Sequence, residues 1–484
     1  MPPAPAAWKD LDILVGGMGA DISSIELVAA AANHPGGRIS GSLSATALAD
    51  IYVHRLQLGD ANNEIREAFT ACGGAIPALA GDIDRLYTNY HIPGGKIVTV
   101  PFRGISIGGM TPPRDVQILT IAATFAHIWR TKKAAPDRPI GINFLRKIER
   151  PLLYGLYGAM LAGADWVVMG AGDISDIPDI MNRLSRNEPA ELSVQVATVP
   201  GGTYRIRFDP KELVGDSLPP PARPAFFAIV SSHLQAAGLA ASDKTRPEGF
   251  VIEAPPAGGH NAPPLKKKLD ERGHYMYGPE DDADLDAVAA LGLPFWLAGG
   301  YGHPEQPDAD RGSRRRQVGT LFALANESGM YPNLRRNVLQ LIWKRQLEVV
   351  TDPCASPSTY PFKVALVPGT IGDPAVYEAR PRRCNVGHLR GYRPMGRRAV
   401  GLCSADDPAI FKKSGGALWR TKGAMCLCNG LLAACGVGQP GEKPVVTLGD
   451  ISPVRELQRR LRRTEYSVAE AIAFLRGETA VKIP

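Results

Sequence analysis

The sequence lacks any uninterrupted apolar run of the roughly 20 residues that a membrane-spanning helix needs. Residues 1–9 are rich in Pro and Ala, and they lack the charged-then-apolar order of a secretory signal. The seven cysteines are an odd number in a chain of 484 residues, which argues against a disulfide framework. We therefore expect a cytoplasmic protein that neither spans nor binds a membrane.

Motifs that recognise nucleic acid are also missing, although the formal net charge is +7. The basic residues are mostly mixed with acidic ones, and their clusters are short, as in 266–268 and 314–316. The sequence has no zinc-finger spacing and no interleaving of aromatic and basic residues. The charge therefore indicates a solvated basic surface, or an anionic cofactor or substrate, and no nucleic-acid partner.

What the chain does have is a repeated order of apolar strand, turn and helix. The eight candidate strands cover 12–15, 37–42, 139–143, 165–169, 226–231, 249–253, 294–298 and 317–322. Helices are expected over 23–33, 116–131, 151–164 and 280–291. Eight strands that alternate with helices predict an α/β fold, with a parallel sheet closed into a TIM (β/α)8 barrel.

Two insertions and a C-terminal extension are expected beside this barrel. The barrel should occupy 1–340, with a helical insertion at about 56–137. A second insertion at about 191–224 alternates like a hairpin. Beyond residue 340 the strand–helix order stops. The remaining region, 341–484, contains six of the seven cysteines and is expected to pack on the barrel.

Barrel enzymes carry their sites at the carboxyl ends of the strands, so residues at those ends are the candidates. Glycines there let a flat ligand approach backbone N–H groups, although each Gly-rich run is also an ordinary tight turn. Loops after strands seven and eight often bind phosphate in barrels. The candidate cofactor-binding residues are Gly17, Met18, Gly19, Asn143, Gly258, Gly259, Ala298, Gly299, Gly300, Gln317, Gly319 and Thr320.

His260 is the candidate catalytic residue. It follows two glycines just beyond the sixth predicted strand, in the run Ala257-Gly258-Gly259-His260. Imidazole is the side chain best matched to proton transfer near neutral pH. A lone histidine is more often structural, but the strand-end position and the flanking glycines favour His260 as a base.

These residues resemble the nitronate monooxygenase family, once called 2-nitropropane dioxygenases. They also resemble its relatives, the FMN-dependent enoyl reductases and the trans-acting enoyl reductases of polyketide and polyunsaturated fatty acid synthases. The resemblance runs from Ile13 to about Gln439. Its motifs are 13–19, 143–145, 155–164, 168–172, 257–260, 298–301, 317–320 and 426–431.

The resemblance implies FMN in a barrel, with Met18 and Asn143 near the flavin. It implies that Gly299, Gly300, Gly319 and Thr320 hold the phosphate, and that His260 is the base. A nitronate monooxygenase converts a nitroalkane and dioxygen to a carbonyl compound and nitrite. An enoyl reductase would instead use NAD(P)H and an acyl thioester, carried in trans by an acyl carrier protein.

A third hypothesis is a degenerate flavin barrel that serves as a scaffold, and a homodimer is an open expectation. Two departures from the resemblance bear on this. Val15 stands where relatives usually have Gln. The segment 303–316 contains Pro307, Gly312 and three arginines where relatives have an amphipathic helix and small apolar residues. Either an arginine pairs with phosphate here, or the segment is a solvated loop.

Four cysteines of the C-terminal region are candidate metal ligands: Cys384, Cys403, Cys426 and Cys428. Their Cys-x-Cys spacing is not that of the usual zinc knuckle. An iron–sulfur cluster is the alternative metal site, because its ligands need not follow one spacing. Buried free thiols are the non-metal alternative.

Overall fold

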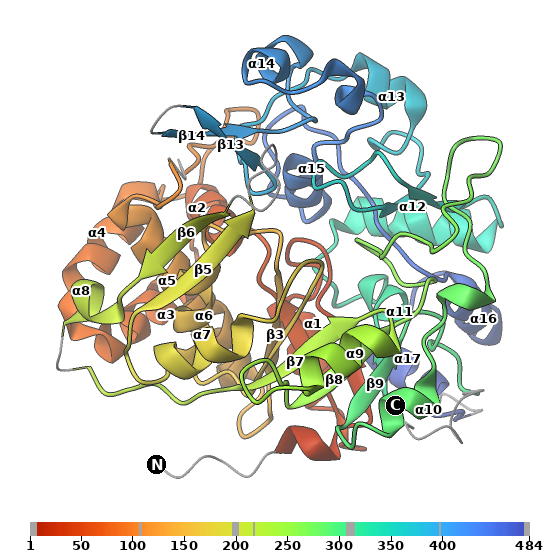
Figure 1. Ribbon diagram of the computed structural model, residues 1–484, viewed down its shortest axis with the longest axis horizontal. Helices are drawn as coiled ribbons and strands as arrows, with labels where there is room; N and C mark the ends of the chain where they lie inside the picture. Colours follow the sequence, from red (N-terminus) through yellow and green to blue (C-terminus); the bar gives the residue numbers. More distant parts are fainter. Residues whose placement is uncertain are drawn as a thin grey trace.

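Eight parallel strands close into a barrel at the centre of the molecule (Figure 1). The computed structural model describes residues 7–105, 109–195, 203–215, 218–305, 315–395 and 398–478. Around the barrel the order is β1-β10-β9-β8-β7-β4-β3-β2, and each neighbouring pair is parallel. The barrel strands are β1 (Ile13–Val15), β2 (Ile39–Ser44), β3 (Gly141–Leu145), β4 (Trp166–Gly170), β7 (Ala225–Val230), β8 (Gly249–Glu253), β9 (Phe295–Ala298) and β10 (Arg316–Val318). This confirms the predicted TIM (β/α)8 barrel.

The eighth predicted strand was wrong at its carboxyl end. Strand β10 stops at Val318, and Thr320–Ala323 forms the short helix α11. The apolar run that begins at Leu321 suits a buried helix as well as a buried strand, so hydrophobic periodicity alone does not separate them. Helix α11 is held in place from the C-terminal region, where the Tyr466 hydroxyl donates to the Leu321 carbonyl oxygen at 2.7 Å.

Aromatic side chains fill the interior of the barrel. The Phe227 ring stacks on Trp296 at 4.8 Å between centroids and on Trp166 at 6.0 Å. Trp8, from the turn Ala7–Asp10 before β1, meets Phe227 edge-on at 4.9 Å. A Cβ at Gly141 would lie 2.1 Å from the Trp166 ring, so only glycine leaves room for that ring. The barrel is therefore a packed core, and ligand space lies beyond the strand ends.

Helices cover the outside of the barrel. They are α1 (Ile25–Ala32), α5 (Arg114–Ala134), α6 (Leu152–Leu161), α7 (Ile177–Leu184), α9 (His233–Ala240) and α10 (Leu285–Ala289). Helix α1 is capped at its N-terminus, because the Ser24 hydroxyl accepts from the Leu27 N–H at 3.1 Å. The helix predicted over 280–291 is shorter than expected, since its acidic start forms a separate turn, Pro279–Asp281.

The two insertions lie together on one side of the barrel, at the left of Figure 1. Helix α2 (Leu48–Leu58) leads into the first insertion, which holds α3 (Glu64–Ala75) and α4 (Ala80–Tyr90) and continues into α5. The second holds the antiparallel hairpin β5 (Ala190–Gln195) and β6 (Thr203–Phe208), followed by α8 (Pro210–Val214). The hairpin was predicted, and its turn at 196–202 lies outside the described residues.

The C-terminal region packs on the barrel and the first insertion, at the top and right of Figure 1. Its Leu432 and Leu448 belong to the same buried cluster as Val15 of β1 and Leu86 of α4. Its elements are α12 (Pro332–Trp343), β11 (Val349–Asp352), β12 (Phe362–Ala365), α13 (Pro374–Ala379), β13 (Gly391–Met395), β14 (Arg398–Leu402), α14 (Pro408–Lys413), α15 (Leu427–Ala434), α16 (Ser452–Leu461) and α17 (Val468–Leu475).

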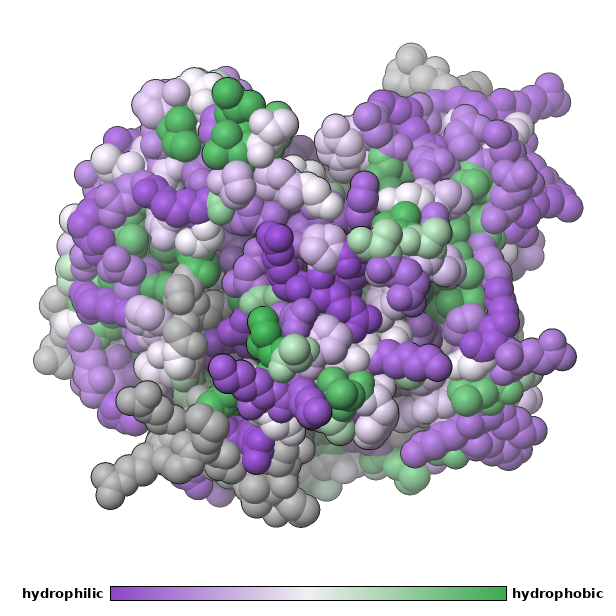
Figure 2. Space-filling model, turned by 90° about the horizontal axis from the view of Figure 1, so that it is seen from above, coloured by the Kyte–Doolittle hydropathy of each residue, from purple (hydrophilic) through white to green (hydrophobic). Residues whose placement is uncertain are grey.

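The face shown in Figure 2 is mostly hydrophilic, with hydrophobic residues in small, separate groups. Among the described residues, every helix is too short or too polar to cross a lipid bilayer.

Candidate functional site

Two adjoining cavities open at the carboxyl ends of the barrel strands. The first, which we call the glycine-lined cavity, takes its walls from the ends of β1, β9 and β10, the loop after β8, and residues 445–450. It contains about 1060 Å³ of space, part of it open to solvent. The second, which we call the histidine cavity, contains about 950 Å³ and includes His260 and His388. Gly17, Glu253 and Gly259 line both, so one ligand can extend from one cavity into the other.

The predicted cofactor-binding residues come together here. Asn143 lines the histidine cavity. The glycine-lined cavity has in its walls Gly17, Met18, Gly19, Gly258, Gly259, Ala298, Gly299, Gly300, Gln317, Gly319 and Thr320. The structure thus gathers all twelve predicted residues around one continuous space. Val15 is fully buried in β1 and lines neither cavity.

Two of these glycines are required by the local geometry. A Cβ at Gly17 would lie 2.1 Å from the Asn143 Cβ, so glycine allows the β1 turn to touch the end of β3. Gly299 has φ +81°, and a Cβ there would lie 2.6 Å from the Ala254 carbonyl oxygen. Both positions therefore bring backbone close to the ligand space, as a flat or anionic ligand requires.

Polar groups of β10 and α11 face the glycine-lined cavity. The Gln317 side-chain oxygen is buried and has no hydrogen-bond partner in the described part of the chain. The Thr320 hydroxyl accepts from the Gly449 N–H at 2.8 Å, which leaves its own hydrogen free to donate. An unpaired buried acceptor is unfavourable, so Gln317 is a point where a bound ligand would restore a hydrogen bond.

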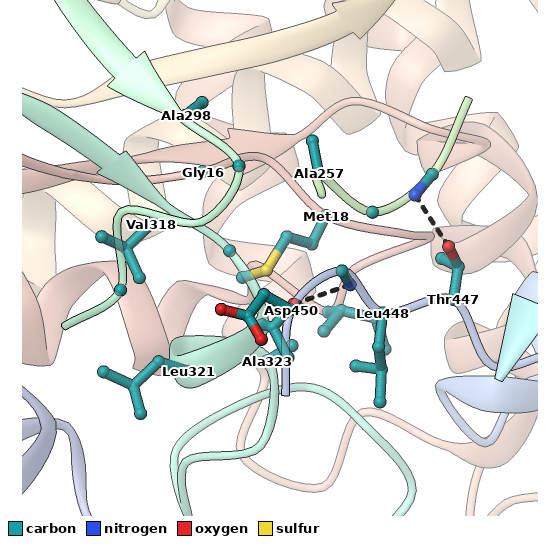
Figure 3. A pocket seen from close by; sticks show the side chains of 18 of the residues that line it. Gly16, Met18, Ala257, Ala298, Val318, Leu321, Ala323, Thr447, Leu448 and Asp450 are labelled. Carbon is teal, nitrogen blue, oxygen red and sulfur yellow. Dashed lines mark hydrogen bonds between the residues drawn. The ribbon is translucent and has the colours of Figure 1, made fainter. Parts of the chain in front are cut away.

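The sequence reasoning missed the segment 445–450, which forms one wall of the glycine-lined cavity. The Thr447 hydroxyl accepts from the Gly259 N–H at 2.8 Å and so ties this segment to the loop before His260. In Figure 3, Met18 reaches into the cavity, and Leu448 and Asp450 lie beside it. No local pattern in the C-terminal region marks this role.

Of the three arginines at 314–316, the two that the structure describes do not line the glycine-lined cavity. Arg315 donates to the Lys9 carbonyl oxygen at 2.8 Å, and Arg316 is buried with bonds to the carbonyl oxygens of His303 and Leu475. Arg314 belongs to 306–314, outside the described residues. In the described wall, backbone N–H groups and the Thr320 hydroxyl are among the hydrogen-bond donors, and the Asp450 carboxylate is held by Ser452.

His260 lies in the histidine cavity, held from the C-terminal region. Its Nε2 is 2.7 Å from the Ser356 hydroxyl oxygen, which is in turn 2.7 Å from the Ser358 hydroxyl oxygen. Burial, with the nearby Lys147 ammonium, lowers the pKa of His260 to about 4. The imidazole is therefore neutral at physiological pH, and the same burial makes it a weaker base than a free histidine.

Glu253, the last residue of β8, is a second titratable group between the cavities, and the sequence reasoning did not select it. Burial raises the pKa of its carboxyl to about 8, although the Lys363 ammonium opposes that shift. Burial also lowers the pKa of Lys363 to about 8. Glu253 is therefore mostly a neutral acid near pH 7, able to donate a proton.

His388 is a second imidazole in the histidine cavity. Its Nε2 is 2.8 Å from a carboxylate oxygen of Asp50 on α2, and both side chains are buried. Its Nδ1 is buried and has no partner in the part of the chain that the structure describes.

Two non-glycine residues of the same cavity, Ala47 and Ala171, have φ +56°. Such strained backbone is concentrated at functional sites.

The four candidate metal ligands lie near one another but do not form a metal centre. Among the described residues, no group of three or more His, Cys, Asp or Glu is arranged to hold a metal ion. The Cys384 sulfur instead accepts from Arg390 Nε at 3.2 Å. The hydrogen bond with Cys403 lowers the pKa of Cys384 to about 6, whereas burial raises the pKa of Cys426 and Cys428. This arrangement does not support the zinc or iron–sulfur alternative.

No protein-family model matches the chain, and no curated protein matches it. Among solved structures, it is similar to nitroalkane oxidase from Streptomyces ansochromogenes, at 12% identity and TM-score 0.44, over 98% of this chain and 99% of that one. It is also similar to a FabK mutant from Thermotoga maritima, at 14% identity and TM-score 0.42, over 97% of this chain and 92% of that one. A third similar structure is the enoyl reductase domain of MlnA from Bacillus amyloliquefaciens, at 12% identity and TM-score 0.38, over 76% of this chain and 67% of that one. The barrel assignment rests on this chain's own strand order.

Proposed function

We propose that the chain is an FMN-dependent oxidoreductase of the nitronate monooxygenase type, with His260 as its base. The observation that carries the proposal is the continuity of the two cavities, because it sets a neutral histidine beside a glycine-lined ligand site. The substrate would be a nitroalkane or its nitronate, and dioxygen would be the co-substrate.

The residues present fit FMN. The glycine turns after β1 and β9 leave room for a large flat group, and Gln317 offers an unpaired acceptor. Gly299, Gly300 and Gly319, with the Thr320 hydroxyl, would hold the phosphate through N–H and O–H donors. Asn143 and Met18 would contact the ring system. Bound FMN supplies the two-electron redox chemistry that amino-acid side chains lack.

His260 would remove the acidic α-proton of the nitroalkane. The C–H bond breaks, the proton moves to the imidazole, and the electron pair stays on the substrate as a nitronate. In the overall oxidation, two nitronates and one dioxygen give two carbonyl compounds and two nitrite ions, so that each carbonyl group takes one oxygen atom of the dioxygen. The Ser356 hydroxyl orients the ring, and burial keeps the imidazole unprotonated before the transfer.

The test uses one variant and two forms of the same substrate. His260→Ala should lower nitrite release from a neutral nitroalkane by about 10²- to 10⁴-fold, the usual contribution of a general base. The same variant should still oxidise the preformed nitronate, whose proton is already gone. His91→Ala, in a partly exposed histidine outside both cavities, is the matched control. Equal losses with both substrate forms would contradict the base role.

Glu253 favours a second candidate, an enoyl-thioester reductase that acts in trans on a carrier protein. Reduction of a C=C bond needs a hydride at one carbon and a proton at the other. A carboxyl that is mostly neutral near pH 7 is a suitable proton donor, and NAD(P)H would be the reductant. Oxidation of NAD(P)H by an enoyl thioester, without nitrite from nitroalkanes, would select this function.

A flavin absorbance spectrum of the purified protein separates both enzymes from the scaffold hypothesis. Either enzyme should be yellow, or become yellow when FMN is supplied. A protein that stays colourless with FMN would support the degenerate barrel and contradict both enzymatic proposals.

A further inference from the structure

Two cysteines, Cys384 and Cys403, lie next to each other beside the hairpin β13–β14 (Figure 1). Cys403 directly follows Leu402, the last residue of β14. Asp406 joins the backbones of the two cysteines: its carboxylate accepts from the Cys384 N–H at 3.0 Å, and its own N–H donates to the Cys403 carbonyl oxygen at 3.1 Å. The side chains meet as well, because Cys384 packs on the buried cluster of Cys403 and a hydrogen bond links the two sulfur groups.

The guanidinium of Arg390 holds the sulfur of Cys384. Arg390 Nε donates to this sulfur at 3.2 Å, and Nη2 donates to the carbonyl oxygen of the same cysteine. Because an arginine side chain stays protonated, this contact stabilises a thiolate on Cys384. The thiolate is the form of cysteine that reacts with peroxides. Cys384 therefore has the environment of a reactive cysteine.

Exposure assigns different roles to the two thiols. Cys384 is partly exposed, whereas Cys403 is 7% exposed. An oxidant from solvent therefore reaches Cys384 first, and Cys403 is the second thiol of the pair. Cys426 belongs to the same buried cluster, but its S–H donates to the Arg383 carbonyl oxygen at 3.7 Å, a contact that favours the protonated, unreactive form. A reactive thiolate beside a second thiol is the usual arrangement of a redox-sensing cysteine.

The segment between the two cysteines reaches the histidine cavity. It contains His388 and Leu389, which line that cavity. His388 is held there by Asp50 of α2, at 2.8 Å. A bond between the two sulfur atoms therefore joins the ends of the segment that carries His388.

We propose that Cys384 and Cys403 form a peroxide-sensitive thiol pair, which hydrogen peroxide converts to a disulfide that joins the ends of the segment 384–403. The Cys384 thiolate attacks one oxygen of the peroxide. An S–O bond forms, the O–O bond breaks, and the released hydroxide takes up the proton that the Cys384 thiol has lost. The Cys403 thiol then attacks the sulfur of the resulting sulfenic acid, so that the S–S bond forms, the S–O bond breaks and water leaves.

In this sequence two thiols are oxidised and one peroxide is reduced to two waters. The chemistry needs neither a bound flavin nor a substrate. It therefore stands or falls independently of the proposed function.

Peptide mapping of the oxidised protein tests the proposal. The purified full-length protein is reduced, freed of reductant, treated with one equivalent of hydrogen peroxide, alkylated in denaturant and digested with trypsin. Cleavage after lysine and arginine places Cys384 in the peptide 384–390 and Cys403 in the peptide 399–412, whereas Cys426 and Cys428 share the peptide 423–455. We expect a disulfide between the first two peptides, which dithiothreitol reverses, and the loss of two of the seven alkylation sites.

Four variants separate the steps. In Cys403→Ser the oxidation should stop at a sulfenic acid on Cys384, which dimedone labels. Cys384→Ser should give neither the disulfide nor the label. Arg390→Gln removes the cation, so Cys384 should lose its preference over the exposed Cys354. Cys354→Ser is the matched control and should form the disulfide as the natural protein does.

Hydrogen exchange tests the effect on the segment. A disulfide removes conformational freedom from the loop that it closes, so amide exchange over residues 385–395 should slow after oxidation. Dithiothreitol should restore the original rate, and in Cys403→Ser peroxide should leave the rate unchanged.

The absence of a disulfide between the peptides 384–390 and 399–412 would overturn the proposal. So would a disulfide from Cys384 to Cys426 or Cys428 in place of Cys403. Release of zinc or iron on oxidation would also contradict it, because the cysteines would then be metal ligands. Unchanged hydrogen exchange in the cross-linked protein would refute the effect on the segment that carries His388.

Discussion

Replacement of Ser356 by alanine tests whether the C-terminal region positions the catalytic histidine. The Ser356 hydroxyl lies 2.7 Å from His260 Nε2, and the next hydroxyl along, on Ser358, lies 2.7 Å from Ser356. A hydrogen bond between neutral groups contributes about 0.5–1.5 kcal/mol net. If it orients the imidazole for proton removal, Ser356→Ala should lower kcat for a neutral nitroalkane by about 2- to 13-fold.

The assay is a double-mutant cycle with nitrite release as the measurement. Ser356→Ala is made in the natural protein and in the His260→Ala variant, with thermal melting as the check on folding. Because Ser356 acts through His260, its replacement should have no further effect once the imidazole is gone. Ser358→Ala, one hydrogen bond further away, should cost less than Ser356→Ala. An equal loss from Ser356→Ala in both backgrounds would refute the positioning role and indicate a general structural effect.

Two further predictions concern pH and the glycine turn. The pKa of His260 is lowered from 6.5 to about 4, so the neutral base persists until the pH falls toward 4, and the acid limb of kcat/KM should lie near 4. The contribution of this histidine to the free energy of unfolding is present above pH 6.5 and is lost as the pH falls toward 4, because the unfolded chain takes up the proton first. An acid limb of kcat/KM near 6.5 would contradict the lowered pKa of the ring. Gly17→Ala places a Cβ 2.1 Å from the Asn143 Cβ. Denaturant unfolding should therefore show a free energy of unfolding lower by about 1–3 kcal/mol, and the variant should bind FMN more weakly. Gly104→Ala, where a Cβ meets nothing within 4 Å, is the control, and equal stability of the two variants would contradict the close approach.

Local patterns in the sequence determined the barrel. Strand and helix periodicity and glycine turns depend on residues a few positions apart, so they can be recognised without the fold. They predicted seven barrel strands to within two residues at each end. They also predicted which strand ends meet, because the carboxyl ends of parallel strands share one face of a barrel. His260 and the glycines of the site follow from that rule.

Only the tertiary structure decided what surrounds those residues. Ser356 reaches His260 across 96 positions, Gly449 reaches Thr320 across 129, and His388 reaches Asp50 across 338. No periodicity connects residues so far apart, because these contacts arise when the C-terminal region folds over the barrel mouth. The same packing made Thr320 the start of a helix instead of part of a strand. It also placed the cysteines as buried or arginine-paired thiols, which their spacing alone left open.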